Sequence, residues 1–290
     1  MQSRSSLALT TGLALGALLL ASSPASAQGP SLGAARDFAV LGASTVTNAG
    51  LTTIDGDLGV SPGTAITGFP PGVVTGTIHA GDALALQAQS DLTLAYDALA
   101  GAACDVVLTG MDLGGLTLTP GVYCFSASAP LNGVVTLDGQ GNPDAVFVFQ
   151  IGSTLLAALG SSVQLVNGVE PDNVFWQVGS SATLSGDVAF KGNLIALASI
   201  TLSAGSSLDG RALARTGAVT MDTSDVSVPA GNTCTPASVE PIARGCGIPA
   251  PVLSCSVPVL GQIATATLDG TVPAVFGRLR LPPAAGLIAS

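Results

Sequence analysis

The residues best placed to do chemistry are hydroxyl side chains that recur at a regular spacing in the middle of the chain. Thr183, Thr201 and Thr220 follow one another at separations of 18 and 19 residues, and each lies between two apolar residues. Ser185 and Ser203 come two residues after the first two threonines. On stacked strands about 4.8 Å apart, with alternate residues about 6.7 Å apart, these side chains would form a two-dimensional grid. Such a grid of hydroxyls and methyls can hold a layer of ordered water.

The grid has interruptions as well as candidate extensions. The same alignment places Leu156 in the threonine column, and Asp222 lies two residues after Thr220. A charged carboxylate holds its own hydration shell and would disturb an ordered layer. Hydroxyl residues that could extend the patch are Thr117, Thr119, Thr136 and Thr154. Because Thr and Ser are common outward residues on any secreted β-solenoid, the columns also fit an ordinary solvated surface.

Short strands with glycine-rich corners must position these residues. In each repeat the apolar residues on either side of the aligned position give the period-two alternation of a half-buried strand. A period near 18 residues, with Gly, Ser and Asn at the corners, predicts one solenoid coil per repeat. Each coil offers two further strands. One has Lys191, Asp209 and Arg211 at outward positions and is expected to be a charged, solvated face.

The third strand of each coil is apolar on both sides and needs a cover. It comprises Ala145–Phe149, Val174–Trp176 and Asn193–Leu197. The segment Asp82–Ala100 contains no Gly or Pro and is predicted to be a helix. Its apolar stripe at helical spacing consists of Leu84, Ala88, Leu92, Ala95 and Leu99. We therefore expect this helix to lie along the solenoid against the doubly apolar face.

Composition and charge argue against several functions. Only 9% of the residues are charged, and the formal net charge is −10, or −11 without residues 1–27, where Arg4 is the only charged residue. An acidic chain repels nucleic acid and anionic lipid. The single histidine, His79, lies in a glycine-rich turn, and no acid–base constellation surrounds it in the sequence. We expect no enzyme, no cofactor, no metal, no nucleic-acid partner and no membrane insertion.

The ends of the chain predict export and a separate tail. Arg4, an apolar stretch over Leu7–Ala21 and the small residues Ala25-Ser26-Ala27 are typical of a signal peptide cut after Ala27, hence of a secreted protein. Residues 28–230 are expected to form the solenoid domain. Residues 231–290, rich in proline and containing cysteines, are expected to be a tail or a partial second module.

Five cysteines in an exported chain favour disulfides over metal ligands. Cys104 and Cys124 flank a predicted strand pair, so we expect them to pair with each other. Cys234, Cys246 and Cys255 leave one odd thiol, and the sequence does not assign their pairing.

With this organisation established, the sequence resembles a known family. Phe38–Asn48, Gly56–Gly72, Thr77–Ala80, Leu118–Tyr123 and Gly192–Ala196 are similar to signature segments of the ice-binding proteins secreted by microbes of cold habitats. The resemblance covers about residues 32–228 and leaves the tail uncovered.

The resemblance implies a mainly β fold, a right-handed triangular β-helix with one helix alongside, in which the order of coils in space differs from that in the sequence. It also implies adsorption to ice through a flat Thr/Ser face, with inhibition of recrystallisation and modest thermal hysteresis. We expect the protein to be a monomer. An extracellular surface or matrix module that binds glycan or protein on the same scaffold remains the alternative.

Overall fold

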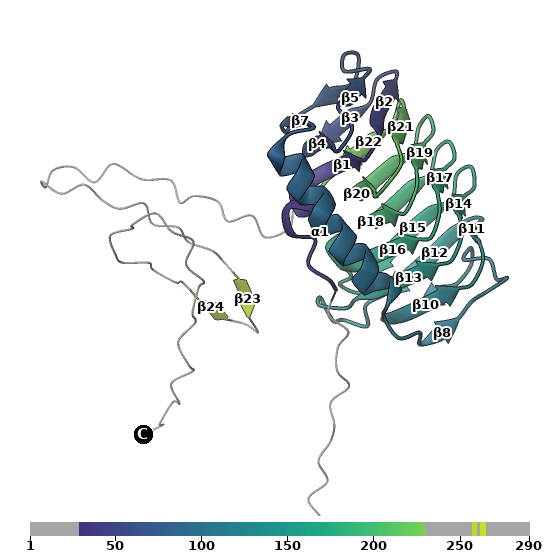
Figure 1. The fold of residues 1–290 in the computed structure, drawn as a ribbon. Coiled ribbons are helices and arrows are strands. Elements are labelled where there is room, and N and C mark those ends of the chain that lie inside the picture. Colours follow the sequence, from purple (N-terminus) through teal and green to yellow (C-terminus); the bar gives the residue numbers. More distant parts are fainter. Residues whose placement is uncertain (1–28, 230–256, 260–261, 265–290) are drawn as a thin grey trace, which may run out of the picture. The chain divides into compact units, whose positions relative to one another are not determined.

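The computed structural model describes residues 29–229, 257–259 and 262–264. A compact unit ends at Pro229, and within it parallel strands wind into stacked coils with one long helix along one side (Figure 1). This confirms the predicted β-solenoid with a covering helix. In the described part of the chain, no helix is long and apolar enough to cross a membrane.

One face of the solenoid is a 7-stranded parallel sheet. Its strands, in spatial order, are β11 (Ala129–Leu131), β14 (Leu155–Ala157), β17 (Ala182–Leu184), β19 (Ile200–Leu202), β21 (Val219–Asp222), β2 (Thr45–Ala49) and β5 (Ala65–Thr67). The alternation predicted for these strands is present, since the first and third residues of β17 and of β19 are buried and the middle residue is not. We call the outward side of this sheet the hydroxyl face.

The other two faces belong to one 15-stranded sheet that folds around a corner. The first of them, which we call the covered face, contains β8 (Val106–Val107), β10 (Gly121–Phe125), β13 (Phe147–Ile151), β16 (Val174–Val178), β1 (Phe38–Gly42), β4 (Asp57–Val60) and β7 (Ile78–Ala80). The second, which we call the charged face, contains β9 (Thr117–Leu118), β12 (Val134–Asp138), β15 (Ser162–Val166), β22 (Asp225–Ser227), β3 (Thr53–Asp55) and β6 (Val73–Val74).

Two long strands, β18 (Ala189–Ala196) and β20 (Ser207–Ala214), run from the charged face onto the covered face. They turn at Gly192 and Gly210, which are partners in register and have φ values of 106° and 151°. A Cβ on Gly210 would lie 2.0 Å from the carbonyl oxygen of Gly192. The corner therefore requires glycine for the close approach of two backbones.

The order of coils in space differs from their order in the sequence, as the resemblance implied. The first strands of the chain, β1, β2 and β3, stack on β20, β21 and β22 of the last repeat. The next strands, β4, β5 and β6, then stack on β1, β2 and β3. The helix returns the chain from this end of the solenoid to the opposite end, where β8 begins (Figure 1).

Residues at equivalent positions of successive coils also form columns in the interior, and one such column is aromatic. Tyr123, Phe149 and Trp176 are partners in register on β10, β13 and β16, and Phe190 follows on β18. Their ring centroids lie 5.4, 3.9 and 4.9 Å apart in succession. The first two pairs are stacked and the third is tilted, and such aromatic contacts add to the free energy gained by burying each ring.

The helix α1 (Ala83–Ala100) forms where it was predicted and covers the doubly apolar strands. Asp82 is its N-cap, and its carboxylate accepts a hydrogen bond from the Ala85 backbone N–H at 2.9 Å. That hydrogen bond and another with the His79 side chain lower the pKa of Asp82. Leu84 was predicted to face the solenoid but is 44% exposed, because the buried stripe runs through Ala85, Ala88, Gln89, Leu92, Ala95, Tyr96 and Leu99 instead.

Polar side chains fasten the helix to the coils. The Gln89 amide nitrogen donates to the carbonyl oxygens of Gly42 and Ala214 at 3.0 and 3.1 Å. At the other end, the Gln150 amide donates to the carbonyl oxygens of Leu99 and Ala102, both at 2.7 Å. The two side-chain amides therefore attach the helix to the coils near both of its ends.

Arg211, predicted as an outward residue of the charged face, is instead buried on the covered face, with 2% of it exposed. The error arises because the corner at Gly210 turns the following residue onto the next face. Its guanidinium donates to Asp172 Oδ1 at 2.6 Å, to Asn193 Oδ1 at 2.8 Å and to the Arg36 carbonyl oxygen at 2.6 Å. It therefore joins two coils to both short 3-10 helices, η1 (Gly33–Asp37) and η2 (Pro171–Asn173).

Cys104 and Cys124 form a disulfide, as predicted. In the tail, β23 (Val257–Val259) and β24 (Gln262–Ala264) pair antiparallel. Residues 1–27, predicted as a signal peptide, and Cys234, Cys246 and Cys255 lie outside the described residues.

Replacing Arg211 by methionine should lower the free energy of unfolding by about 3 kcal/mol, because it leaves buried partners of the guanidinium unpaired. Lys191→Met is the matched control, since Lys191 pairs with Asp209 at 2.7 Å but both side chains are more than a third exposed. An exposed pair is worth no more than about 1 kcal/mol. Urea denaturation of both variants measures the difference, and equal losses would contradict the structural role of Arg211.

Candidate functional site

A column of threonines runs along the middle of the hydroxyl face. Thr183, Thr201 and Thr220 are partners in register, as the repeat predicted. The column continues through Thr47 on β2 and Thr67 on β5. Thr47 and Thr220 touch, with their Oγ1 atoms 3.3 Å apart.

Thr47 and Thr67 were missed because they lie outside the repeat. Thr47 is 173 residues from Thr220 in the sequence, and only the stacking of the first coils on the last repeat brings them together. The available signal was the alternation around Thr47 and Thr67, each of which follows a buried or half-buried aliphatic residue.

Flanking positions add further hydroxyls. Ser185 and Ser203 follow the threonines of β17 and β19 by two residues and are half-buried. On the opposite flank Thr154 precedes β14, and its hydroxyl lies 2.7 Å from that of Ser128 on the neighbouring coil. Thr154 therefore belongs to the same surface as the central column.

The hydroxyl face loses its regularity at one end and at one edge. Beyond Thr183 the central column continues with Leu156, which is 50% exposed, and with Pro130. Beside Thr220, Asp222 is exposed, and its carboxylate accepts a hydrogen bond from the Thr223 hydroxyl at 3.0 Å. The uninterrupted part of the central column therefore runs from Thr183 to Thr67, with Asp222 at its edge.

Three of the predicted hydroxyl residues do not extend this patch. Thr117 and Thr136 are partners on β9 and β12, and Thr136 is also in register with Gln164 on β15, so both lie on the charged face. Thr119 follows β9, and its carbonyl oxygen accepts a hydrogen bond from the Tyr123 hydroxyl at 2.5 Å. The prediction was wrong because short Thr-containing strands occur on more than one face, and spacing alone did not separate them.

The two solvated faces differ in charge. The charged face carries the Lys191–Asp209 ion pair together with Asp55 and Asp225. In the described part of the hydroxyl face, the central column carries no ionisable side chain from Pro130 to Thr67. Neutral hydroxyls and methyls at strand spacing can order water without binding ions, and the backbone hydrogen bonds of the sheet hold them rigidly in place.

Comparison with known proteins agrees with this geometry. The family described as ice-binding-like matches residues 40–227. An ice-binding protein of Nostoc sp. (strain HG1) is 58% identical over 197 residues, which are 68% of this chain and 73% of that protein.

Two crystal structures share the fold. An ice-binding protein from an Antarctic biological consortium gives a TM-score of 0.67 at 45% identity, covering 77% of this chain and 96% of its own. One from the Antarctic ascomycete Antarctomyces psychrotrophicus gives a TM-score of 0.67 at 44% identity, covering 69% and 98%. The chain therefore belongs to the ice-binding-like protein family.

Proposed function

We propose that this chain binds ice through the hydroxyl face, and that the residues making the contact are Thr183, Thr201, Thr220, Thr47 and Thr67 with Ser185, Ser203 and Thr154 beside them. The observation that carries the proposal is the in-register, uncharged threonine column. Relatives named as ice-binding proteins support the same activity.

The physical basis is a rigid template for water. Each threonine contributes a hydroxyl that can hydrogen-bond to water and a methyl that restricts where water can lie. Each such contact is weak, and the contacts add up because the sheet holds the side chains in place before ice is met. Ice presents no charge, so the uncharged central column also avoids the cost of removing water from an ion.

We further propose that the protein acts outside the cell as a monomer, after removal of residues 1–27. A disulfide between Cys104 and Cys124 suits an oxidising compartment. Adsorption needs one accessible flat face and no chemical step, so the proposed function involves no catalysis and no cofactor.

Replacing Thr201 by tyrosine should abolish the shaping of ice crystals and most of the gap between freezing and melting temperatures, because the ring projects from the middle of the flat face. Stability should change by no more than about 0.5 kcal/mol, because the side chain points outward. Thr136→Tyr is the matched control on the charged face and should keep full activity. Round, unshaped crystals with the unaltered protein at high concentration would contradict ice binding.

Replacing Leu156 by threonine should increase ice activity, because it extends the column by one coil beyond Thr183. Asp222→Ser should act in the same direction by removing the charge beside Thr220. Thermal hysteresis measured at equal protein concentrations tests both variants. Lower activity in both variants would contradict this expectation and would show that Leu156 and Asp222 themselves contribute to ice binding.

A further inference from the structure

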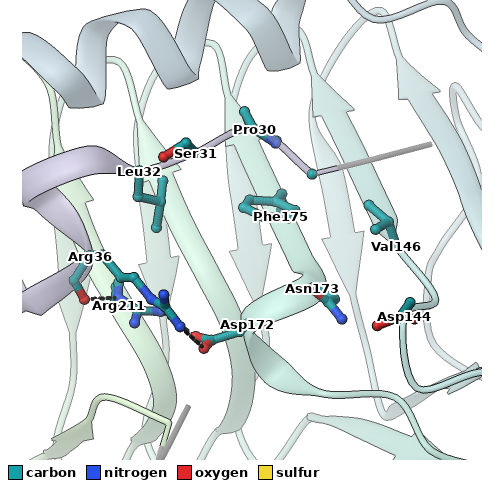
Figure 2. Close-up of a pocket in the computed structure, with 11 residues that line it drawn as sticks. Pro30, Ser31, Leu32, Arg36, Asp144, Val146, Asp172, Asn173, Phe175 and Arg211 are labelled. Atoms are coloured by element: carbon teal, nitrogen blue, oxygen red, sulfur yellow. Dashed lines mark hydrogen bonds and ion pairs between the residues drawn. The ribbon is translucent and has the colours of Figure 1, made fainter. Parts of the chain in front are cut away.

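A cavity of about 630 Å³ opens on the covered face, which belongs to a different sheet from the hydroxyl face. Figure 2 shows its walls: the segment through Pro30 and Leu32 on one side, Phe175 at the back, and Asp172 and Asn173 of η2 opposite. It is large enough to take a small organic molecule. Leu32, Val146 and Phe175 in its lining also belong to the apolar cluster under α1, but no residue of the proposed ice contact lines it.

The buried Arg211 guanidinium forms part of this cavity. Its Nε atom and one terminal nitrogen, Nη1, are occupied by the Arg36 carbonyl oxygen, Asp172 and Asn193. Within residues 29–229 the other terminal nitrogen, Nη2, has no hydrogen-bond partner, and it is not among the fully enclosed unpaired atoms. Because Arg211 is only 2% exposed, Nη2 is the part of this otherwise paired side chain that remains to donate to a ligand at the cavity.

Acceptors lie on the same walls. The Asp144 residue is exposed, and within residues 29–229 its carboxylate makes no hydrogen bond. The Asn173 amide nitrogen donates to the Pro143 carbonyl oxygen at 3.1 Å, which leaves its amide oxygen free to accept. Hydrogen-bond donors and acceptors thus lie around the same cavity (Figure 2).

The charges of the lining cancel. Arg36 and Arg211 are balanced by Asp144 and Asp172, and Asp172 is already paired with both arginines, at 3.5 and 2.6 Å. An anion would meet the two carboxylates, and a cation would meet the two guanidinium groups. The lining therefore favours a neutral ligand whose groups both donate and accept hydrogen bonds.

We propose that this cavity binds one unit of a neutral saccharide. Sugar hydroxyls donate to the carboxylate of Asp144 and to the amide oxygen of Asn173, and they accept from Arg211 Nη2. Leu32 and Val146, each 7% exposed, leave a small apolar surface in the lining that can contact the C–H groups of the sugar ring. Because the cavity and the hydroxyl face lie on different sheets, the protein can hold a polysaccharide while its ice face stays free.

The test is saturation-transfer NMR on the full chain with a panel of neutral hexoses, N-acetylhexosamines and their disaccharides. A dozen-atom ligand in an open cavity should bind with a dissociation constant of about 1 mM. Asp144→Ala and Asn173→Ala should each weaken binding about tenfold or more, and Asp144→Ala should fold normally because the carboxylate makes no internal hydrogen bond. Thr201→Tyr should leave saccharide binding unchanged.

Other outcomes would overturn the proposal. No saturable binding by any neutral sugar in the panel would do so, as would binding that both cavity variants retain. Stronger binding of glucuronate or glucosamine than of the neutral sugars would show that the site selects charge. Ice activity measured in parallel on Asp144→Ala should be unchanged. Failure of the saccharide proposal would therefore not contradict the ice-binding proposal.

Discussion

In-register parallel hydrogen bonding between successive coils is the constraint on which the rest of this molecule depends. It holds neighbouring strands about 4.8 Å apart and places each residue directly over its equivalent in the next coil. When the same type of residue occupies one position in every coil, it therefore forms a column along the solenoid. Outside, this gives Thr183, Thr201 and Thr220, and inside it gives the stacked rings of Phe149 and Trp176. The flat surface and the stable core are two results of the same ladder.

The ladder also repeats the character of the side chains along each face, so each face can take a different role. One has a neutral, largely hydroxylated central column, one carries ion pairs such as Lys191–Asp209, and one is apolar and lies under α1. The covered face nevertheless contains polar side chains, of which Arg211 is the largest. It is tolerated because Asp172, Asn193 and the Arg36 carbonyl oxygen satisfy its donors, and an unpaired guanidinium there would be strongly destabilising.

Local patterns in the sequence were enough to predict the solenoid, the covering helix, the Cys104–Cys124 disulfide and the centre of the threonine column. Period-two and helical spacings are properties of neighbouring residues, so a single chain displays them. What could not be predicted depends on corners and on coil order. A turn at Gly210 carried Arg211 to another face, and Thr47 reached the threonine column through a pairing that no local pattern encodes.

That long-range pairing ties the ice-binding proposal to completion of the fold. Thr47 and Thr67 join Thr220 only when the first coils close on the last repeat, across 173 residues of sequence in the case of Thr47 and Thr220. Contacts of such separation carry a loop-closure entropy cost that the rest of the fold must offset. The central part of the hydroxyl face is therefore a property of the closed solenoid. The repeats from β14 to β21 alone would present only three of its five aligned threonines.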